Sequence, residues 1–109
     1  MSFYIYILHS LIANKYYVGY SNDPFRRLIE HNSTPFNSYT SKFRPWELKA
    51  CFYCGTDEKR AITLERFIKK QKSRTLLEKL INPDFIPDGF LAQLVRVPHR
   101  AGQVPSVRD

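Results

Sequence analysis

Two strand-like segments near the start of the chain restrict its fold more than any other feature. Residues Phe3 to Leu8 and Tyr16 to Tyr20 are rich in Tyr, Ile and Val, which are enriched in β-strands. Between them, Asn14-Lys15 is a good position for a turn, so we predict an antiparallel hairpin. Apolar residues alternate onto both sides of the first segment, which indicates that both faces of the sheet are covered.

Helix signals follow the hairpin. Asn22 or Asp23 would cap a helix, with Pro24 in its first turn, and the helix should run to about Asn32. The rest of the predicted order is a loop from Ser33 to Pro45, a strand from Trp46 to Tyr53, a helix from Glu58 to Lys72 and a short helix from Thr75 to Ile81.

The length of 109 residues suits one domain. We predict that residues 1–82 form it and that residues 83–109 are a Pro-rich extension, with a loose tail from Arg100 to Asp109. No apolar run approaches the length of a membrane span, and no secretory signal is recognisable, so we expect a cytoplasmic protein that does not enter a membrane.

Charge indicates the partner. Lys and Arg number 17 against 10 acidic residues, a net charge of +7 with a pI near 9.6. In so small a domain this favours a polyanion, so we predict DNA, with RNA possible, although a solvated helix face fits the basic run equally well. The candidate nucleic-acid contacts are Arg66, Lys69, Lys70, Lys72 and Arg74, in a stretch without acids, and the smaller cluster Lys42 and Arg44.

Cys51 and Cys54 form a single Cys-x-x-Cys without a second pair. A structural zinc site is therefore poorly supported, and buried thiols in a reducing compartment are the better interpretation. On a strand, their spacing would put the two thiols on opposite faces.

One acid interrupts the apolar stripe of the second helix. Helical spacing places Glu65 between Ala61 and Ile68, on the side that should be buried. Burying an unpaired carboxylate is very costly, so Glu65 must meet a cation, a metal ion or water.

Five short motifs follow one another along the chain on the predicted strands and helices. They are Tyr4-Ile5-Tyr6, Tyr17-Val18-Gly19, Arg27, His31, and Glu65 in Leu64-Glu65-Arg66-Phe67-Ile68-Lys69. This set resembles the GIY-YIG nuclease family, most closely its small single-domain bacterial members, whose first helix ends in the same Arg-x-x-x-His-Asn manner. The resemblance covers about Phe3 to Ile81.

The resemblance implies an α/β fold of the α+β type, a small three-stranded antiparallel sheet flanked by helices. It also implies an endonuclease that hydrolyses phosphodiester bonds in DNA, is structure-selective or non-specific, and serves DNA repair or processing. Glu65 would be the single protein ligand of one Mg²⁺ or Mn²⁺ ion, a hard cation that keeps several waters.

The other motif residues receive roles from the same resemblance. Tyr17 would orient the attacking water or accept its proton, and Tyr6 would support the water network. Gly19 would leave space for the phosphate. Arg27 would match phosphate oxygens with its planar fork, and His31 would hydrogen-bond the nucleophile or a phosphate oxygen.

Plainer interpretations stay open beside these roles. Tyr6 and Tyr17 fit ordinary strand aromatics, Arg27 and His31 fit a surface pair on a helix, and Glu65 fits an ion pair with Arg27. At the level of the whole chain, the alternatives are a non-catalytic basic module that binds nucleic acid and a nuclease domain that awaits a partner.

Two positions depart from the family pattern. Tyr4 stands where the family's name has Gly, and Tyr20 stands where some members have Lys. Tyr20 removes one positive charge near the phosphate and leaves open whether Lys42 or Arg44 supplies it. We expect the loop that contains Ser38-Tyr39-Thr40 to face the substrate.

Overall fold

The computed structural model describes residues 1–33 and 39–98, and its centre is an antiparallel sheet. The strands lie in the order β2-β1-β3-β4, so β2 is at one edge. Their bounds are β1 Tyr4–Ser10, β2 Tyr16–Ser21, β3 Trp46–Tyr53 and β4 Val95–Arg96. The prediction of three strands was wrong, because β4 has only two residues and is too short to show an alternating pattern in the sequence.

The predicted hairpin is present. β1 and β2 pair from Tyr4 opposite Ser21 to His9 opposite Tyr16, and this register sets Tyr6 opposite Gly19. Asn14 turns the chain with a φ of 52°, a left-handed conformation that Asn tolerates better than most residues.

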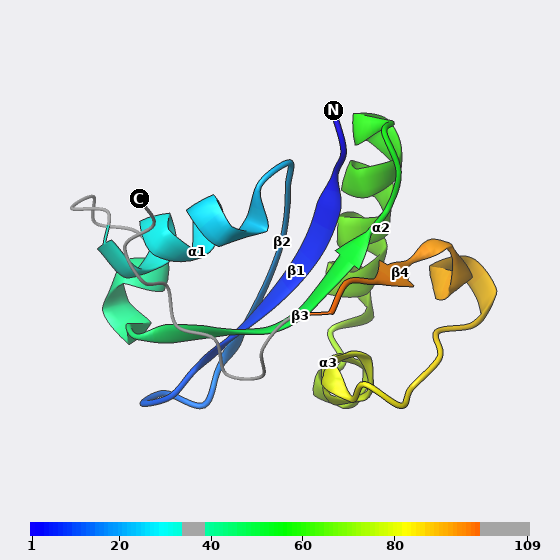
Figure 1. Ribbon diagram of the computed structural model, residues 1–109. Helices are drawn as coiled ribbons and strands as arrows, with labels where there is room; N and C mark the ends of the chain where they lie inside the picture. Colours follow the sequence, from blue (N-terminus) through cyan, green and yellow to red (C-terminus); the bar gives the residue numbers. More distant parts are fainter. Residues whose placement is uncertain (34–38, 99–109) are drawn as a thin grey trace.

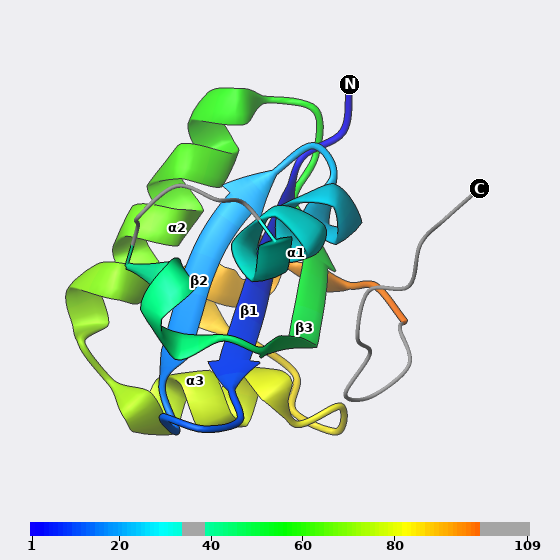
Figure 2. The same ribbon diagram turned by 90° about the vertical axis from the view of Figure 1, so that its left-hand side faces the viewer.

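Helices cover the sheet on both sides. Helix α1 (Pro24–Ser33) lies over one face, and α2 (Glu58–Gln71) and α3 (Arg74–Ile81) lie on the other side (Figure 1). Figure 2 looks onto the α1 face and shows α2 alongside the β2 edge. Because α2 follows this edge, its side chains can approach the face that carries α1.

The helix ends follow local hydrogen bonding. The Asp23 carboxylate accepts the backbone N–H of Arg26 at 3.1 Å, so Asp23 rather than Asn22 caps α1. Helix α2 ends one residue before the predicted Lys72, which adopts a left-handed conformation with a φ of 47°. Within the predicted loop from Ser33 to Pro45, Thr40–Phe43 instead form a 3-10 helix, η1, and residues 34–38 are outside the described residues.

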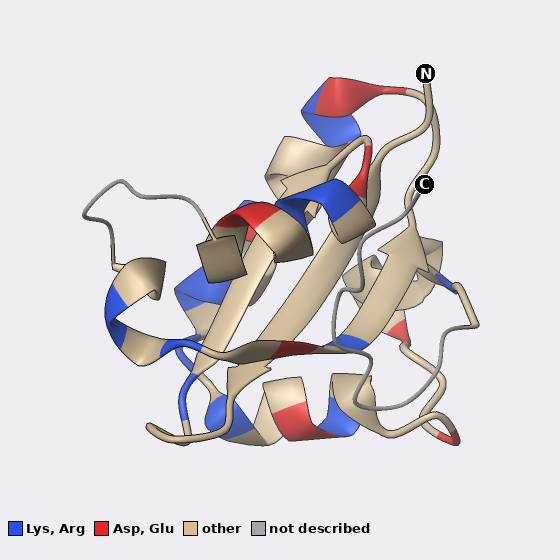
Figure 3. Cartoon of the chain, turned by 60° about the vertical axis from the view of Figure 1, so that its left-hand side comes forward, with Lys and Arg blue, Asp and Glu red and all other residues tan. Residues whose placement is uncertain are grey.

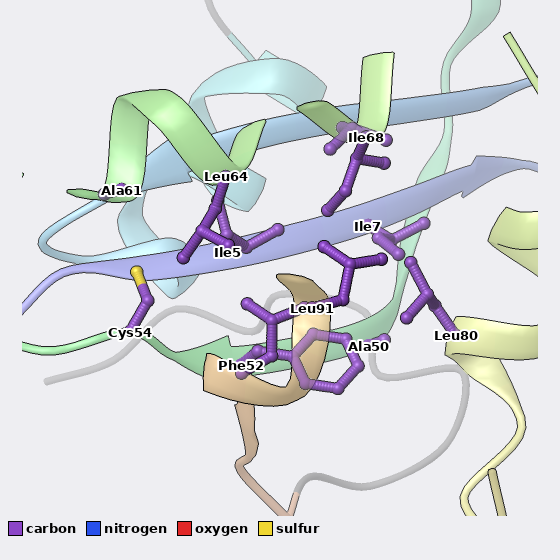
Figure 4. Close-up of a cluster of buried hydrophobic side chains, with 12 residues drawn as sticks. Ile5, Ile7, Ala50, Phe52, Cys54, Ala61, Leu64, Ile68, Leu80 and Leu91 are labelled. Atoms are coloured by element: carbon purple, nitrogen blue, oxygen red, sulfur yellow. The ribbon is translucent and has the colours of Figure 1, made fainter. Parts of the chain in front are cut away.

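Two apolar clusters flank the sheet. On the α2 side, Ile5, Ile7 and Phe52 pack against Leu64 and Ile68 (Figure 4). On the α1 side, a smaller cluster consists of Tyr6, Leu8, Leu28, Trp46 and Leu48. The predicted coverage of both faces is confirmed.

Part of the Pro-rich extension belongs to the same core. Leu91, in the 3-10 helix η2 (Gly89–Gln93), and Leu94 are each 6% exposed and pack with the α2-side cluster. The Arg96 guanidinium lies over the Phe52 ring at 4.7 Å. The predicted loose tail from Arg100 to Asp109 is outside the described residues.

Cys51 and Cys54 are free thiols, and each is 2% exposed. Cys51 pairs with Tyr6 across the sheet, whereas Cys54 belongs to the cluster on the α2 side, so the expected opposite placement is confirmed. Burial raises the pKa of the Cys51 thiol to about 12. None of the described helices has the length and apolar character needed to cross a membrane.

Candidate active site

Three aromatic side chains meet on the α1 face of the sheet. The Tyr6 hydroxyl lies 3.0 Å from His31 Nε2, and the ring centroids of Tyr17 and His31 are 4.7 Å apart. The Tyr6 and Tyr17 rings are 6.3 Å apart. The hairpin register and α1 thus bring together three of the predicted site residues.

The pKa values of Tyr6 and His31 indicate which atoms donate and which accept in the hydrogen bonds of this cluster. Burial raises the pKa of Tyr6 to about 12 and, with the charge of Arg27, lowers the pKa of His31 to about 4. Near neutral pH both groups are uncharged, so the Tyr6 O–H can donate to His31 Nε2. The Nδ1–H of His31 then donates to Thr40 Oγ1, which is 3.0 Å away.

These contacts change the expected role of His31. The side chain is 6% exposed, and both ring nitrogens are engaged within the protein, by Tyr6 and by Thr40. His31 is therefore placed to position Tyr6 and does not face a substrate.

Arg27 lies one helical turn before His31 and is more open. Its side chain is 37% exposed and forms an ion pair with Glu30. Burial disfavours the charge of the guanidinium, but hydrogen bonds to Tyr6 and Glu30 outweigh this effect and raise the pKa of Arg27. Arg27 and His31 thus both act on the Tyr6 phenol.

Glu65 has the inward position that the sequence predicted. Its side chain is 16% exposed, and one carboxylate oxygen lies 3.3 Å from the Lys69 ammonium. Lys69 also lies over the Tyr17 ring, with its Nζ 5.5 Å from the centroid. The cation that offsets the acid is therefore Lys69 and not Arg27, whose ion pair is with Glu30.

The expected role of Gly19 was wrong. A Cβ added there would lie 2.5 Å from Cζ and Oη of Tyr6, because the two residues are directly paired across the hairpin. The space beside Gly19 is filled by the Tyr6 phenol, so this glycine makes room for a protein side chain instead of a phosphate.

A groove of about 380 Å³ opens next to Tyr17, between β2, α2 and the start of α3. Of the predicted nucleic-acid contacts, Lys69, Lys72 and Arg74 line it, joined by Lys15 from the hairpin. The lysines and arginines of the hairpin, η1 and the end of α2 lie toward one side of the molecule (Figure 3).

The other predicted contacts are not among the residues that line the groove. Lys42, Arg66 and Lys70 are exposed on η1 and α2, and Arg44 donates from Nε to the His31 carbonyl at 2.6 Å.

Tyr20, which stands where some family members have Lys, donates a hydrogen bond from its hydroxyl to Glu58 at 3.2 Å and packs on the α2 side of the sheet. Lys69 provides a positive charge at Tyr17 without help from Lys42 or Arg44.

Among the candidate site residues, Glu65 has the carboxylate that could bind a divalent ion. The described residues contain no group of three or more His, Cys, Asp or Glu side chains that would hold a metal. The Glu65 carboxylate is partly open and pairs with Lys69, which lines the groove, and a hard ion such as Mg²⁺ accepts one carboxylate while water and substrate oxygens fill its other positions. The donor set is compatible with a sparsely held Mg²⁺ or Mn²⁺.

Sequence reasoning missed three residues of the site. Thr40 holds His31, and Lys15 extends the groove. The Asn32 side chain both donates to the Trp46 carbonyl at 2.9 Å and accepts the Trp46 N–H at 2.7 Å, which fixes the end of α1 to β3. Asn32 had a sequence signal as part of the motif that ends the first helix. Thr40 had one only as part of the loop expected to face the substrate: it is instead buried against His31, whereas Tyr39 is exposed and Ser38 lies outside the described residues.

Comparison with known proteins agrees with this geometry. The family model described as GIY-YIG catalytic domain matches residues 2–80. Two curated proteins of Trypanosoma cruzi (strain CL Brener), structure-specific endonuclease subunit SLX1 homolog 1 and homolog 2, are each 36% identical over 67 residues. These matches cover 56% of this chain but only 13% of either relative.

Proposed function

The chain belongs to the GIY-YIG catalytic-domain family, and from this premise we propose that it is a divalent-metal-dependent endonuclease that hydrolyses phosphodiester bonds in DNA. The observation that carries the proposal is the arrangement around Tyr6 and Tyr17. A buried polar network holds the first phenol, and the Lys69 ammonium, which is paired with the Glu65 carboxylate, lies over the ring of the second.

In the proposed reaction, Tyr17 faces the groove and orients the attacking water or takes its proton. The Lys69 ammonium over its ring stabilises negative charge that develops there. Arg27, on the same face and partly exposed, supplies N–H donors to the phosphate oxygens as negative charge grows on them.

Tyr6, His31 and Thr40 act from inside the protein. Tyr6 is 1% exposed, so its hydroxyl serves to hold the Arg27 guanidinium in place, and His31 and Thr40 fix the direction of that hydroxyl. Such support limits the movement of the groups that contact substrate, on which rate depends steeply.

Glu65 would hold the metal ion. When bound, Mg²⁺ or Mn²⁺ supplies charge neutralisation at the phosphate and a more acidic water. Glu65 provides its carboxylate from α2, and Lys69 would be displaced from that carboxylate or share it.

Substrate and setting belong to the same proposal. The relatives are named structure-specific endonuclease subunits, which favours branched DNA and a link to DNA repair or processing. The chain spans only about an eighth of their length, so selectivity for DNA structure is proposed for this domain alone. We retain the likeness to small bacterial members and, because both cysteines are free thiols, a cytoplasmic setting.

A second candidate is a non-catalytic module that binds nucleic acid. The basic groove favours it, since phosphate binding needs no metal. Such binding should weaken steeply with salt and respond to Mg²⁺ only through screening.

The deciding experiment is cleavage of supercoiled plasmid and of branched DNA with Mg²⁺ or Mn²⁺. We expect nicking that chelator abolishes and that Tyr17→Phe and Glu65→Gln reduce by about 100-fold or more, with unchanged thermal unfolding. Lys59→Ala is the matched control, because Lys59 is exposed at the far end of α2. Full activity of Glu65→Gln would remove the metal assignment, and no turnover by the wild type on any DNA would favour the binding module.

A further inference from the structure

The groove beside Tyr17 has a size and a lining that the proposed reaction does not by itself explain. Its volume of about 380 Å³ is near the small end of the range for small-molecule pockets. Such a space accommodates a single nucleotide and is far too small for a duplex. Tyr17 is one of the residues that line it, so whatever occupies the groove lies next to the phosphate that reacts in the proposed mechanism.

The charge of the groove is strongly positive. It is lined by Lys15, Lys69, Lys72 and Arg74, and none of the described residues that line it is acidic. Two of these cations already have protein partners. Lys69 pairs with Glu65, and Arg74 donates to the backbone carbonyl and the side-chain oxygen of Asn14 at 2.8 and 2.6 Å.

Lys15 and Lys72 differ from these two. Within residues 1–33 and 39–98, no carboxylate lies within 4.0 Å of either ammonium. Lys15 lies over the Phe43 ring at 5.1 Å, and both lysines are exposed. An anion in the groove would gain two cations without breaking an ion pair.

The aromatic residues of the groove are not equally open. The Tyr16 ring is covered by the Arg74 guanidinium at 4.7 Å, and the Tyr17 ring by Lys69. Tyr39 is 52% exposed and contacts Phe43 edge to face, with ring centroids 5.1 Å apart. Tyr39 is therefore the phenol in this groove best placed to stack on a base.

We propose that this groove binds one unpaired nucleotide of the cleaved strand, next to the cut, with its phosphate at Lys15 and Lys72 and its base on Tyr39. Cations beside an exposed aromatic ring are the usual means of holding a single strand without reading its sequence. This inference rests on the proposed nuclease function and narrows its substrate to nucleic acid that is single-stranded at the cleavage point.

The first test measures binding of a labelled oligothymidine and of a blunt duplex of equal length, in chelator so that neither is cut. We expect Lys15→Ala/Lys72→Ala to weaken single-strand binding about tenfold and, because one phosphate loses its contact, to lower the slope of log affinity against log salt by about 0.7. Duplex binding should change by less than about threefold. The control Lys59→Ala should change neither, and an equal loss on both nucleic acids would overturn the proposal.

The second test isolates stacking at Tyr39. Tyr39→Ala should weaken single-strand binding about tenfold, whereas Tyr39→Phe, which keeps the ring, should bind as the wild type does. Retained binding by Tyr39→Ala, with the fold intact by circular dichroism, would contradict the proposed position of the base.

The two proposals can fail separately. If the wild type cleaves DNA with metal but the groove variants bind both nucleic acids normally, the nuclease function stands and the groove assignment is wrong. If the groove variants lose single-strand binding but no DNA is ever cleaved, the groove assignment stands and the nuclease function is wrong.

Discussion

The Tyr6 phenol occupies the space that a side chain at Gly19 would need, since an added Cβ would lie 2.5 Å from both Cζ and Oη of Tyr6. Tyr6 in turn contacts His31 and Arg27. The glycine of the second motif therefore supports the tyrosine of the first, and through it the Arg27 guanidinium.

This relationship predicts the effect of Gly19→Ala. The new methyl group must displace the Tyr6 ring, so we expect a loss of about 1–3 kcal/mol in the free energy of unfolding, measured by urea denaturation. Cleavage should fall as well, because Tyr6 holds Arg27.

The control separates packing from backbone strain. In a Tyr6→Leu background, which removes Cζ and Oη, Gly19→Ala should cost clearly less than in the wild type. Gly55 has a φ of 97° and open space around its Cβ position, so Gly55→Ala should cost the same in both backgrounds. Equal costs of Gly19→Ala in the two backgrounds would show that Tyr6 is not the obstacle.

The second prediction concerns pH and His31. Burial lowers the pKa of His31 from 6.5 to about 4, so between these values the unfolded chain binds more protons than the folded one. The contribution of neutral His31 to the stability of the folded protein is fully present above pH 6.5 and is lost as the pH falls toward 4. Over this interval the free energy of unfolding, measured in urea, should fall by on the order of 2 kcal/mol more for the wild type than for His31→Gln. Parallel pH curves for the two proteins would show that His31 does not titrate in this way.

The third prediction concerns the connection between α1 and β3. Asn32→Ala removes both hydrogen bonds to the Trp46 backbone, and we expect a loss of about 2 kcal/mol in the free energy of unfolding. Asn22 bonds Arg26 at the exposed start of α1, so Asn22→Ala should cost less than about 0.5 kcal/mol. A similar small effect at both positions would mean that Asn32 is not a structural clamp.

Local patterns were sufficient to predict much of this fold. The alternation in β1, the Asp23 cap and the bounds of β3 all appear in short stretches of sequence, and the structure confirms them. The two residues of β4 give no such pattern, and they pair with β3 next to Leu91 and Leu94, whose packing on a sheet far away in the sequence no local pattern indicates.

The positions of the candidate residues on their helices were predictable from the sequence, and the contacts between elements were less so. The spacing of Arg27 and His31 and the inward side of Glu65 follow from helical geometry, and the structure agrees. Which groups meet across elements does not follow from spacing. Thr40 meets His31 because the path of η1 brings it to α1, and Lys69 meets the Tyr17 ring because α2 runs along the β2 edge. The Glu65–Lys69 pair, by contrast, lies within α2 at a spacing of four and does follow from helical geometry.

The last prediction uses the pair between Lys69 and Glu65. If Glu65 holds the metal, the ammonium 3.3 Å away competes with a divalent ion for the same carboxylate. Lys69→Met removes the charge but keeps the length of the side chain. Mn²⁺ affinity measured by calorimetry should rise several-fold, because a partly exposed positive charge that repels the metal ion is lost. Cleavage should nevertheless fall, because Lys69 also lies over Tyr17. Lys59→Ala lowers the net charge equally and should leave Mn²⁺ affinity unchanged. If Lys69→Met binds Mn²⁺ no better than Lys59→Ala does, the ion is not held at Glu65.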